Sequence, residues 1–181
     1  TFKMMKSTEV GSLVSDQSYT VLCTWADLDT EGFPDVVMQP SNGRLQLHHN
    51  DGNGTFSRVP GGSLSAILSD WGLAWGDFDN DGYPDLFTGR WDLGCAGLHR
   101  NLDGTTFTNV SPAGDLHNLN HTCSGTWGDY DNDGYLDLLV VANKVPGTLY
   151  RNRGDGTFQA VDLGNLLTDG ARRGAGHHVV V

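Results

Sequence analysis

Three short segments of the chain carry carboxylates at alternating positions. The segment WGDFDNDGYPDL begins at Trp75 and holds four aspartates within nine positions, Asp77, Asp79, Asp81 and Asp85. Like charges this close repel one another and destabilise a compact state unless something offsets the repulsion. Carboxylates at alternate positions of a tight loop can all point at one cation, and the glycine after the third acidic residue permits the sharp turn. The spacing therefore indicates a site for a hard divalent cation.

The acidic segment is one copy of a repeat. It returns as WADLDTEGFPDV at Trp25 and as WGDYDNDGYLDL at Trp127, and the three tryptophans are separated by 50 and 52 residues. A second motif recurs as HHNDGNGTF, HRNLDGTTF and YRNRGDGTF, with spacings of 51 and 51 between Asn50, Asn101 and Asn152. Two separate motifs that each recur three times indicate a repeat protein.

Each repeat predicts four short strands. An apolar stretch leads into the acidic loop, a second apolar run follows it, a third segment ends in the recurring asparagine, and a Gly/Asp turn leads into a final Thr-Phe segment. Short runs between such turns are typical of antiparallel strands. Four strands in about 50 residues indicate a β-propeller blade, so we predict an all-β fold. Helical turns are expected only near Ser63–Ser69 and Gly114–Asn120.

We treat residues 1–181 as one repeat domain of about three and a half blades. Residues 1–20 are expected to form the end strand of a preceding blade and a connection, because Thr1-Phe2 aligns with the later Thr-Phe segments. Blades 1, 2 and 3 are placed at 21–61, 62–112 and 113–163, and 164–181 would start a fourth blade. Three blades are too few to close a propeller, and an open array exposes strand edges. Either the chain is a window of a longer protein, or strands of another copy complete it in a filament or ring.

The pattern D-x-D-x-D-G-x-x-D, followed by an apolar strand, resembles the calcium loop of FG-GAP (VCBS-type) repeats. These repeats form the β-propellers of integrin α subunits and of many secreted proteins. The motifs W-G-D-Y-D-N-D-G and N-x-G-D-G-T-F resemble those of the group related to cartilage acidic protein and its bacterial homologues. The resemblance spans nearly the whole chain. It implies about three structural Ca²⁺ ions, each pinning the hairpin between the first two strands of its blade.

Each loop is assigned four acidic side chains and one backbone carbonyl as ligands. They are Asp27, Asp29, Glu31 and Asp35 with the Phe33 carbonyl; Asp77, Asp79, Asp81 and Asp85 with the Tyr83 carbonyl; and Asp129, Asp131, Asp133 and Asp137 with the Tyr135 carbonyl. The first loop departs from the pattern, because Glu31 replaces an aspartate and Thr30 replaces an asparagine. We expect that site to be weaker or rearranged. Polar turns with Asx caps are the alternative without an ion, and magnesium stays open. An EF-hand is disfavoured, since no helices flank the loops.

The net charge of −11 argues against partners such as nucleic acid or anionic membranes. Three calcium ions would bring the formal charge to about −5. No apolar run approaches the roughly 18 residues of a membrane span. No nucleophile and base stand together apart from the acidic loops, so we do not expect an enzyme.

The three cysteines leave at least one thiol unpaired within this chain. A disulfide between Cys95 and Cys123 is geometrically reasonable, because the two connections that carry them share a face of a propeller. We expect Cys23 to be a buried strand residue, or to be paired outside the chain.

Glycosylation sequons begin at Asn53, Asn109 and Asn120. One sequon arises easily by chance. Three sequons on predicted surface turns, together with calcium loops, favour a eukaryotic secretory route and an extracellular or cell-surface location.

Trp71 and Trp91 do not recur between repeats and are expected, with Arg90, on the face opposite the acidic loops. Exposed tryptophans there can stack on sugar rings, although local packing is the more ordinary role. We expect a non-catalytic module for adhesion or protein recognition, with a protein or glycan partner on that face. Two alternatives stay open: a structural subunit of a glycosylated extracellular fibre or coat assembled by strand complementation, and a carbohydrate-binding propeller.

Overall fold

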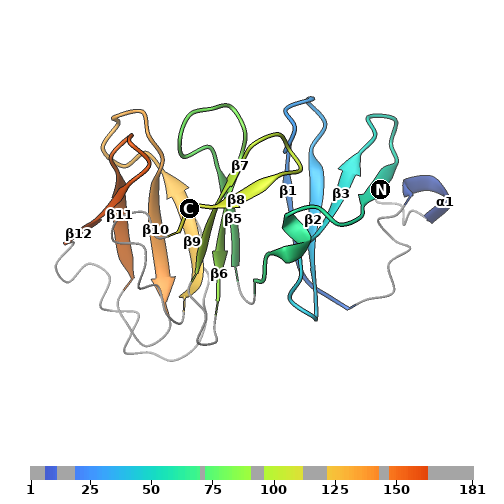
Figure 1. Ribbon diagram of the computed structural model, residues 1–181, viewed down its shortest axis with the longest axis horizontal. Coiled ribbons are helices and arrows are strands. Elements are labelled where there is room, and N and C mark those ends of the chain that lie inside the picture. The colour runs from blue at the N-terminus through green and yellow to red at the C-terminus, as the bar shows by residue number, and fades with distance from the viewer. Residues whose placement is uncertain are drawn as a thin grey trace, which may run out of the picture. The chain divides into compact units, whose positions relative to one another are not determined.

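The computed structural model describes residues 7–11, 19–69, 72–90, 96–111, 122–142 and 147–162. Within these ranges the strands form three four-stranded antiparallel sheets, each with its strands side by side in chain order (Figure 1). This confirms the predicted all-β fold with four strands per blade. Across the same ranges, no helix has both the length and the apolar composition that a membrane span requires.

The strand bounds follow the repeat. The first sheet holds β1 (Thr20–Ala26), β2 (Asp35–Pro40), β3 (Gln46–Asn50) and β4 (Phe56–Val59). The second holds β5 (Gly72–Gly76), β6 (Asp85–Gly89), β7 (Gly97–Asn101) and β8 (Phe107–Asn109). The third holds β9 (Thr122–Gly128), β10 (Asp137–Ala142), β11 (Thr148–Asn152) and β12 (Phe158–Val161).

The chain forms two compact units. Unit 1 comprises Thr1–Ser69, Gly82–Pro84 and Arg100–Thr108, and so contains the first sheet. Unit 2 comprises Asp70–Asp81, Asp85–His99 and Asn109–Val181, and so contains the third sheet and most of the second. Each unit is described by itself below.

Helical structure is confined to two single turns in the described ranges. A 3-10 turn at Leu64–Ala66 confirms the turn expected near Ser63–Ser69. Helix α1 (Ser7–Val10) was not predicted, and Gly11 after it bridges to Phe56 at the start of β4. The turn expected at Gly114–Asn120, the Thr1-Phe2 strand and the fourth-blade start at 164–181 lie outside the described residues.

The three sheets share one register between their first two strands. The recurring tryptophan pairs with the second residue of the next strand, as Trp25↔Val36, Trp75↔Leu86 and Trp127↔Leu138. The last residue of the first strand then pairs with the last aspartate of the acidic loop, as Ala26↔Asp35, Gly76↔Asp85 and Gly128↔Asp137. The loop is therefore the connection of a hairpin, and its last aspartate is already part of a strand.

Trp127 is half-buried and packs against the core of unit 2, which includes Phe78 and Phe158. Its ring stacks on Phe78 with centroids 6.2 Å apart and planes inclined by 13°, and it also meets Phe158 at 6.2 Å. Its Nε1 donates to the carbonyl of Ala74 at 3.2 Å. A Cβ at Gly76 would lie 2.6 Å from the Trp127 ring, so this close approach requires glycine.

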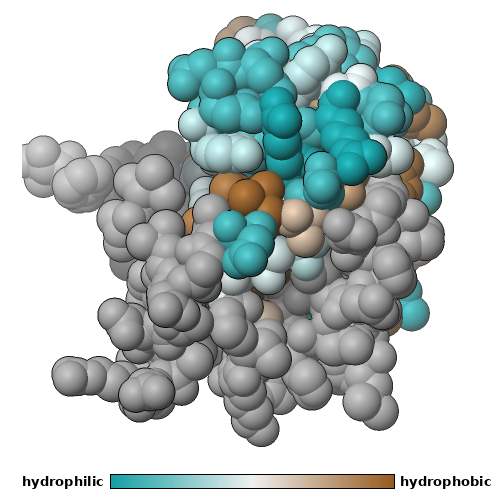
Figure 2. Space-filling model, turned by 90° about the vertical axis from the view of Figure 1, so that its left-hand side faces the viewer, coloured by the Kyte–Doolittle hydropathy of each residue, from teal (hydrophilic) through white to brown (hydrophobic). Residues whose placement is uncertain are grey.

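The first strand of unit 1 has a different environment. Tyr19, just before β1, is 87% exposed, and Val21 and Trp25 within β1 are 62% and 58% exposed. Cys23 lies between Val21 and Trp25 and is exposed, so the prediction that it is a buried strand residue was wrong. Its pairing outside the chain stays a prediction. Alternation puts these residues on one face of an edge strand, which no described part of the chain buries. The face of the molecule drawn in Figure 2 differs from this apolar side of β1, because its described residues are mostly hydrophilic.

Candidate metal centres

The three acidic loops share one backbone shape. The fourth residue of each loop, counted from its first aspartate, has a positive φ: 62° for Thr30, 59° for Asn80 and 58° for Asn132. The glycines two positions later, Gly32, Gly82 and Gly134, have φ values of 89°, 95° and 90°. Both positions are left-handed, which glycine adopts freely and which asparagine tolerates better than a β-branched threonine. The two left-handed residues fold each loop back on itself and direct its alternating carboxylates inward.

The last aspartate of each loop is almost fully buried, with exposures of 1%, 0% and 0% for Asp35, Asp85 and Asp137. In each loop its Oδ2 accepts a hydrogen bond from a backbone N–H near the loop start, at 3.2, 3.0 and 3.0 Å. In the first and third sheets its Oδ1 also accepts from the backbone N–H of Asn50 or Asn152, both at 2.8 Å. This aspartate thus ties the loop to the third strand.

Burial raises the pKa of Asp35 and of Asp137, and neighbouring carboxylates raise both pKa values further. The N–H donors described above oppose this shift. Burial penalises the ionised form of a carboxyl group unless a positive charge compensates it. A cation beside these carboxylates is therefore compatible with their environment.

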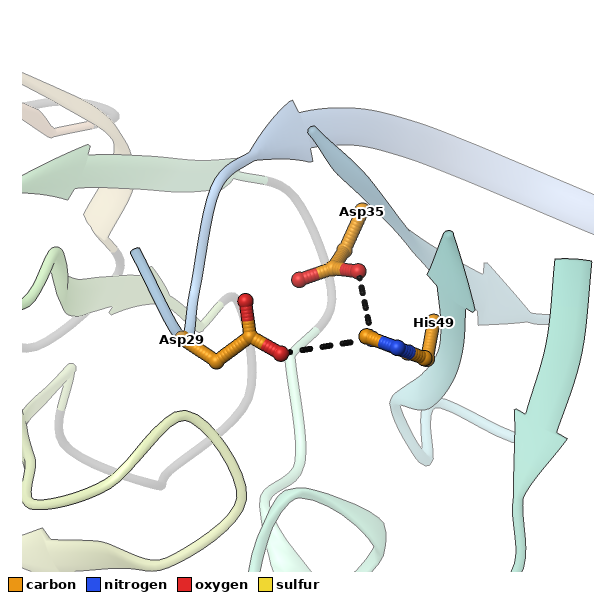
Figure 3. A group of neighbouring side chains, drawn as sticks. All are labelled: Asp29, Asp35 and His49. Carbon is orange, nitrogen blue, oxygen red and sulfur yellow. Dashed lines mark hydrogen bonds and ion pairs between the residues drawn. The ribbon is translucent and has the colours of Figure 1, made fainter. Parts of the chain in front are cut away.

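The structure gathers three potential ligand groups in each loop region, with ligand atoms within 4.8 Å of one another. The clusters are Asp29, Asp35 and His49 in the first sheet; Asp77, Asp79 and Asp85 in the second; and Asp129, Asp131 and Asp137 in the third. Figure 3 shows the first cluster, where the side chains come from the acidic loop, β2 and β3. The three carboxylates of the second cluster and of the third match the oxygen ligands of a hard divalent cation.

The other assigned side chains lie outside these clusters. Asp27 Oδ2 accepts from the Gly32 N–H at 2.8 Å, while Asp133 pairs with Arg151 at 3.1 Å. Glu31 and Asp81 are also not members. The ligand role of the Phe33, Tyr83 and Tyr135 carbonyls stays a prediction.

His49 was missed by sequence reasoning. It precedes the recurring asparagine, where the other two repeats have Arg100 and Arg151. Its Nδ1 lies 3.4 Å from Asp29 Oδ2 and 3.1 Å from Asp35 Oδ1. In the third sheet the Arg151 guanidinium instead reaches Asp131 at 2.7 Å and Asp133 at 3.1 Å. The signal that could have revealed His49 was this departure from arginine at one repeat position.

Two of the recurring asparagines, Asn101 and Asn152, connect consecutive loops. The sequence marked them as repeat positions without indicating this role. In unit 1, Asn101 Nδ2 donates to the carbonyl of Pro84, at the end of the second loop, at 3.0 Å. The same nitrogen donates to the carbonyl of Leu28 in the first loop at 2.9 Å. One buried amide therefore holds the acidic loops of two successive repeats.

The third repeat uses the same arrangement within unit 2. Asn152 Nδ2 donates to the Phe78 carbonyl in the second loop at 2.7 Å and to the Leu136 carbonyl in the third at 3.1 Å. Asn50 Nδ2 donates to Pro34 in its own loop at 3.0 Å, with no second carbonyl acceptor among the described residues.

Two predicted glycosylation positions are exposed. Asn53 lies in the turn before β4, and Asn109 ends β8. The Oδ1 atom of each accepts a backbone N–H two residues later, from Thr55 and Ser111. Asn120 lies outside the described residues, and use of the sequons stays a prediction.

The predicted partner face is described only in part. Arg90 is half-buried directly after β6. Trp71, Trp91, Cys95 and the side chain of Cys123 lie outside the described residues. The proposed disulfide and the role of both tryptophans therefore stay predictions.

Comparison with known proteins agrees with this geometry. A search of curated protein sequences finds no match. The structure is similar to that of an Agrocybe aegerita lectin described as specifically recognising non-reducing terminal N-acetylglucosamine, with a TM-score of 0.57 and 19% sequence identity. The match covers 86% of this chain and 42% of the lectin chain, and at this identity it supports the fold alone. The FG-GAP-like repeat family matches residues 11–88 and 129–181, which is most of the chain, and the chain therefore belongs to the FG-GAP-like repeat family.

Proposed function

We propose that the chain is a calcium-stabilised, non-catalytic recognition module of an extracellular or cell-surface protein. The observation that carries this proposal is the threefold recurrence of a ligand cluster around one buried aspartate. A polar turn without an ion does not need converging carboxylates, of which the second and third clusters hold three each and the first holds two. Three copies at the same hairpin position indicate a role in holding each blade together.

The second and third clusters would hold calcium through oxygen atoms of Asp77, Asp79 and Asp85, and of Asp129, Asp131 and Asp137. Calcium takes six to eight oxygen ligands, so backbone carbonyls and water would complete each site. The ion would supply the positive charge that lets the buried aspartate stay ionised. The protein contributes the loop, with its two residues in the left-handed conformation, and the hydrogen bonds that orient that aspartate.

Calcium binding to the folded chain alone would stabilise it by mass action, by about 2.7 kcal/mol at a free concentration 100 times the dissociation constant. Thermal unfolding with calcium and with chelator tests this directly. Asp79→Ala and Asp131→Ala should each reduce the calcium-dependent gain in melting temperature. Unchanged calcium dependence in both variants would refute the proposal.

Asp162→Ala is a matched control, since it removes one exposed negative charge beyond the clusters and after β12. It should leave the calcium dependence intact. A similar loss in Asp162→Ala would mean that calcium acts through general charge screening rather than at built sites.

The exposed Asn53 and Asn109 sequons support the extracellular location. Expression through a secretory pathway, followed by glycosidase treatment, tests it. A mass shift that disappears in Asn53→Gln and Asn109→Gln would support use of these sequons.

Glycan binding is a second candidate function, favoured by the likeness to the N-acetylglucosamine-recognising lectin. We place its site on the face opposite the acidic loops, around Trp71, Arg90 and Trp91. Titration with N-acetylglucosamine and a glycan array would detect binding. Loss of binding in Trp91→Ala with the melting temperature unchanged would support this function. Absence of binding to every sugar would favour a protein partner.

A further inference from the structure

We infer that the first cluster, Asp29, Asp35 and His49, is a mixed nitrogen and oxygen site for a borderline transition-metal ion such as Zn²⁺. This inference rests on the proposed function, because it treats the acidic loops as metal sites. It assigns one loop to a different class of ion from the other two.

The donor set differs in kind between the loops. A neutral imidazole nitrogen has a lone pair that suits zinc, copper and nickel, whereas calcium prefers oxygen. The corresponding residue in the third sheet is Arg151, and a guanidinium has no acceptor lone pair. Arg151 instead places a fixed positive charge 2.7 Å from Asp131, beside the cluster. Of the three residues at this repeat position, His49, Arg100 and Arg151, only His49 can offer a nitrogen ligand.

The two distances from His49 to the carboxylates match neighbouring ligands of a small tetrahedral ion. Zinc bonds to nitrogen and carboxylate oxygen are about 2.0–2.1 Å long, so neighbouring ligand atoms of a tetrahedral site lie roughly 3.3 Å apart. His49 Nδ1 lies 3.1 Å from Asp35 Oδ1 and 3.4 Å from Asp29 Oδ2. Figure 3 shows the imidazole facing both carboxylates, so a metal ion could replace the Nδ1 proton between them.

The surroundings support three protein ligands and one open position. Asp35 is buried and held by the backbone N–H groups of Leu28 and Asn50, which fixes the orientation of its carboxylate. The side chains of His49 and Asp29 are 31% and 23% exposed, so solvent can supply the fourth ligand. In the same loop Asp27 Oδ1 is buried and accepts no hydrogen bond from the described residues.

Calorimetric titration of the full chain with Zn²⁺, in calcium sufficient to fill the oxygen sites, tests the inference. We expect one zinc equivalent to bind in the wild type. His49→Arg installs the residue of the other repeats and should weaken that binding by at least about 10- to 100-fold, the range known for loss of a supporting partner alone. Cobalt(II) should give a visible absorption band in the wild type that is lost in His49→Arg.

Two further variants keep the test decisive. The reciprocal Arg151→His should create a second zinc equivalent at the third cluster. Asp162→Ala removes an exposed carboxylate that belongs to none of the three clusters and should leave zinc binding unchanged. If His49→Arg does not fold, His49→Ala replaces it with the same expectation.

The outcomes separate this inference from the proposed function. Zinc affinity that is unchanged in a folded His49→Arg would overturn the inference and show that His49 makes only a structural hydrogen bond. Loss of calcium stabilisation in Asp131→Ala together with unchanged zinc binding there would uphold both. Absent calcium dependence with retained zinc binding would refute the proposed function alone.

Discussion

Trp25 in the first sheet and Trp127 in the third occupy the same position of the repeat and the same register against the second strand. Trp127 stacks on Phe78 and donates a hydrogen bond to a backbone carbonyl, whereas Trp25 is 58% exposed and meets Phe56 only at its edge. The comparison shows that the repeat fixes the hairpin around each tryptophan. What the tryptophan contributes to stability is decided by its neighbours.

Other repeat positions teach the same lesson. The loop residue at Phe78 is 3% exposed, yet the equivalent Tyr130 is 48% exposed. The Asn152 amide donates hydrogen bonds to carbonyls of two loops. Among the described residues, the Asn50 amide donates only to a carbonyl of its own loop. A repeat residue that is structural in one sheet is therefore available for contacts in another.

The largest expected effect is the difference in stability between variants of the two tryptophans. Trp127→Ala removes a half-buried stacked ring that packs against the core of unit 2 and should lower the free energy of unfolding by about 3 kcal/mol. Trp25→Ala should cost about 1 kcal/mol or less, because its ring is mostly in solvent. Urea unfolding of both variants measures the difference. Equal losses would mean that another molecule covers Trp25 in solution.

A pH effect comes next and separates the second sheet from the third. His99 and Tyr150 occupy one strand position, and burial lowers the pKa of His99 to about 4. The folded state then binds fewer protons than the unfolded state, whose histidine pKa is about 6.5. The free energy of unfolding should therefore be unaffected by His99 above about pH 6.5. It should fall by up to about 3 kcal/mol as the pH drops toward 4.

His99→Tyr, the residue of the third sheet, should flatten this part of the pH profile. The slope of the unfolding free energy between pH 7 and pH 4 is the measurement, so a constant packing cost does not disturb it. An unchanged slope would assign the acid sensitivity to other groups.

A smaller effect tests the asparagines. Asn152→Ala leaves two carbonyls of Phe78 and Leu136 without their donor and should cost about 1–3 kcal/mol. Asn50→Ala leaves one described carbonyl, that of Pro34, without its donor in a less buried place and should cost about 0.5–1 kcal/mol. Melting temperatures of the two variants rank them. The reverse order would show that Asn50 meets a second acceptor in solution.

The smallest expected effect concerns loop strain. Thr30 is a β-branched residue in the left-handed region, where the third loop has Asn132. Thr30→Asn should stabilise the first loop by about 0.5–1 kcal/mol, and Asn132→Thr should destabilise the third by a similar amount. Thermal unfolding in chelator isolates this backbone effect from ion binding. A stabilised Asn132→Thr variant would contradict it.

Local patterns in the sequence predicted the hairpins well, because turn residues and apolar runs act over a few positions. The left-handed glycines and the inward carboxylates follow from the loop motif alone. His49 was not predicted, because it reaches Asp35 only through the pairing of β2 with β3. The link from Asn101 to Leu28 spans 73 residues and depends on tertiary contact. Exposure of Cys23 was also missed, since an alternating strand does not reveal which side has a partner.

The asparagine link has a consequence for how ions would be taken up. Asn101 holds a carbonyl in the first loop and another at the end of the second, so a shift in either loop on ligand binding alters a bond to the other. Binding events joined in this way share a coupling free energy, which acts equally in both directions. Titration curves should then be steeper or shallower than those of independent sites. In a chain of such repeats, each loop would sense the occupancy of its neighbour.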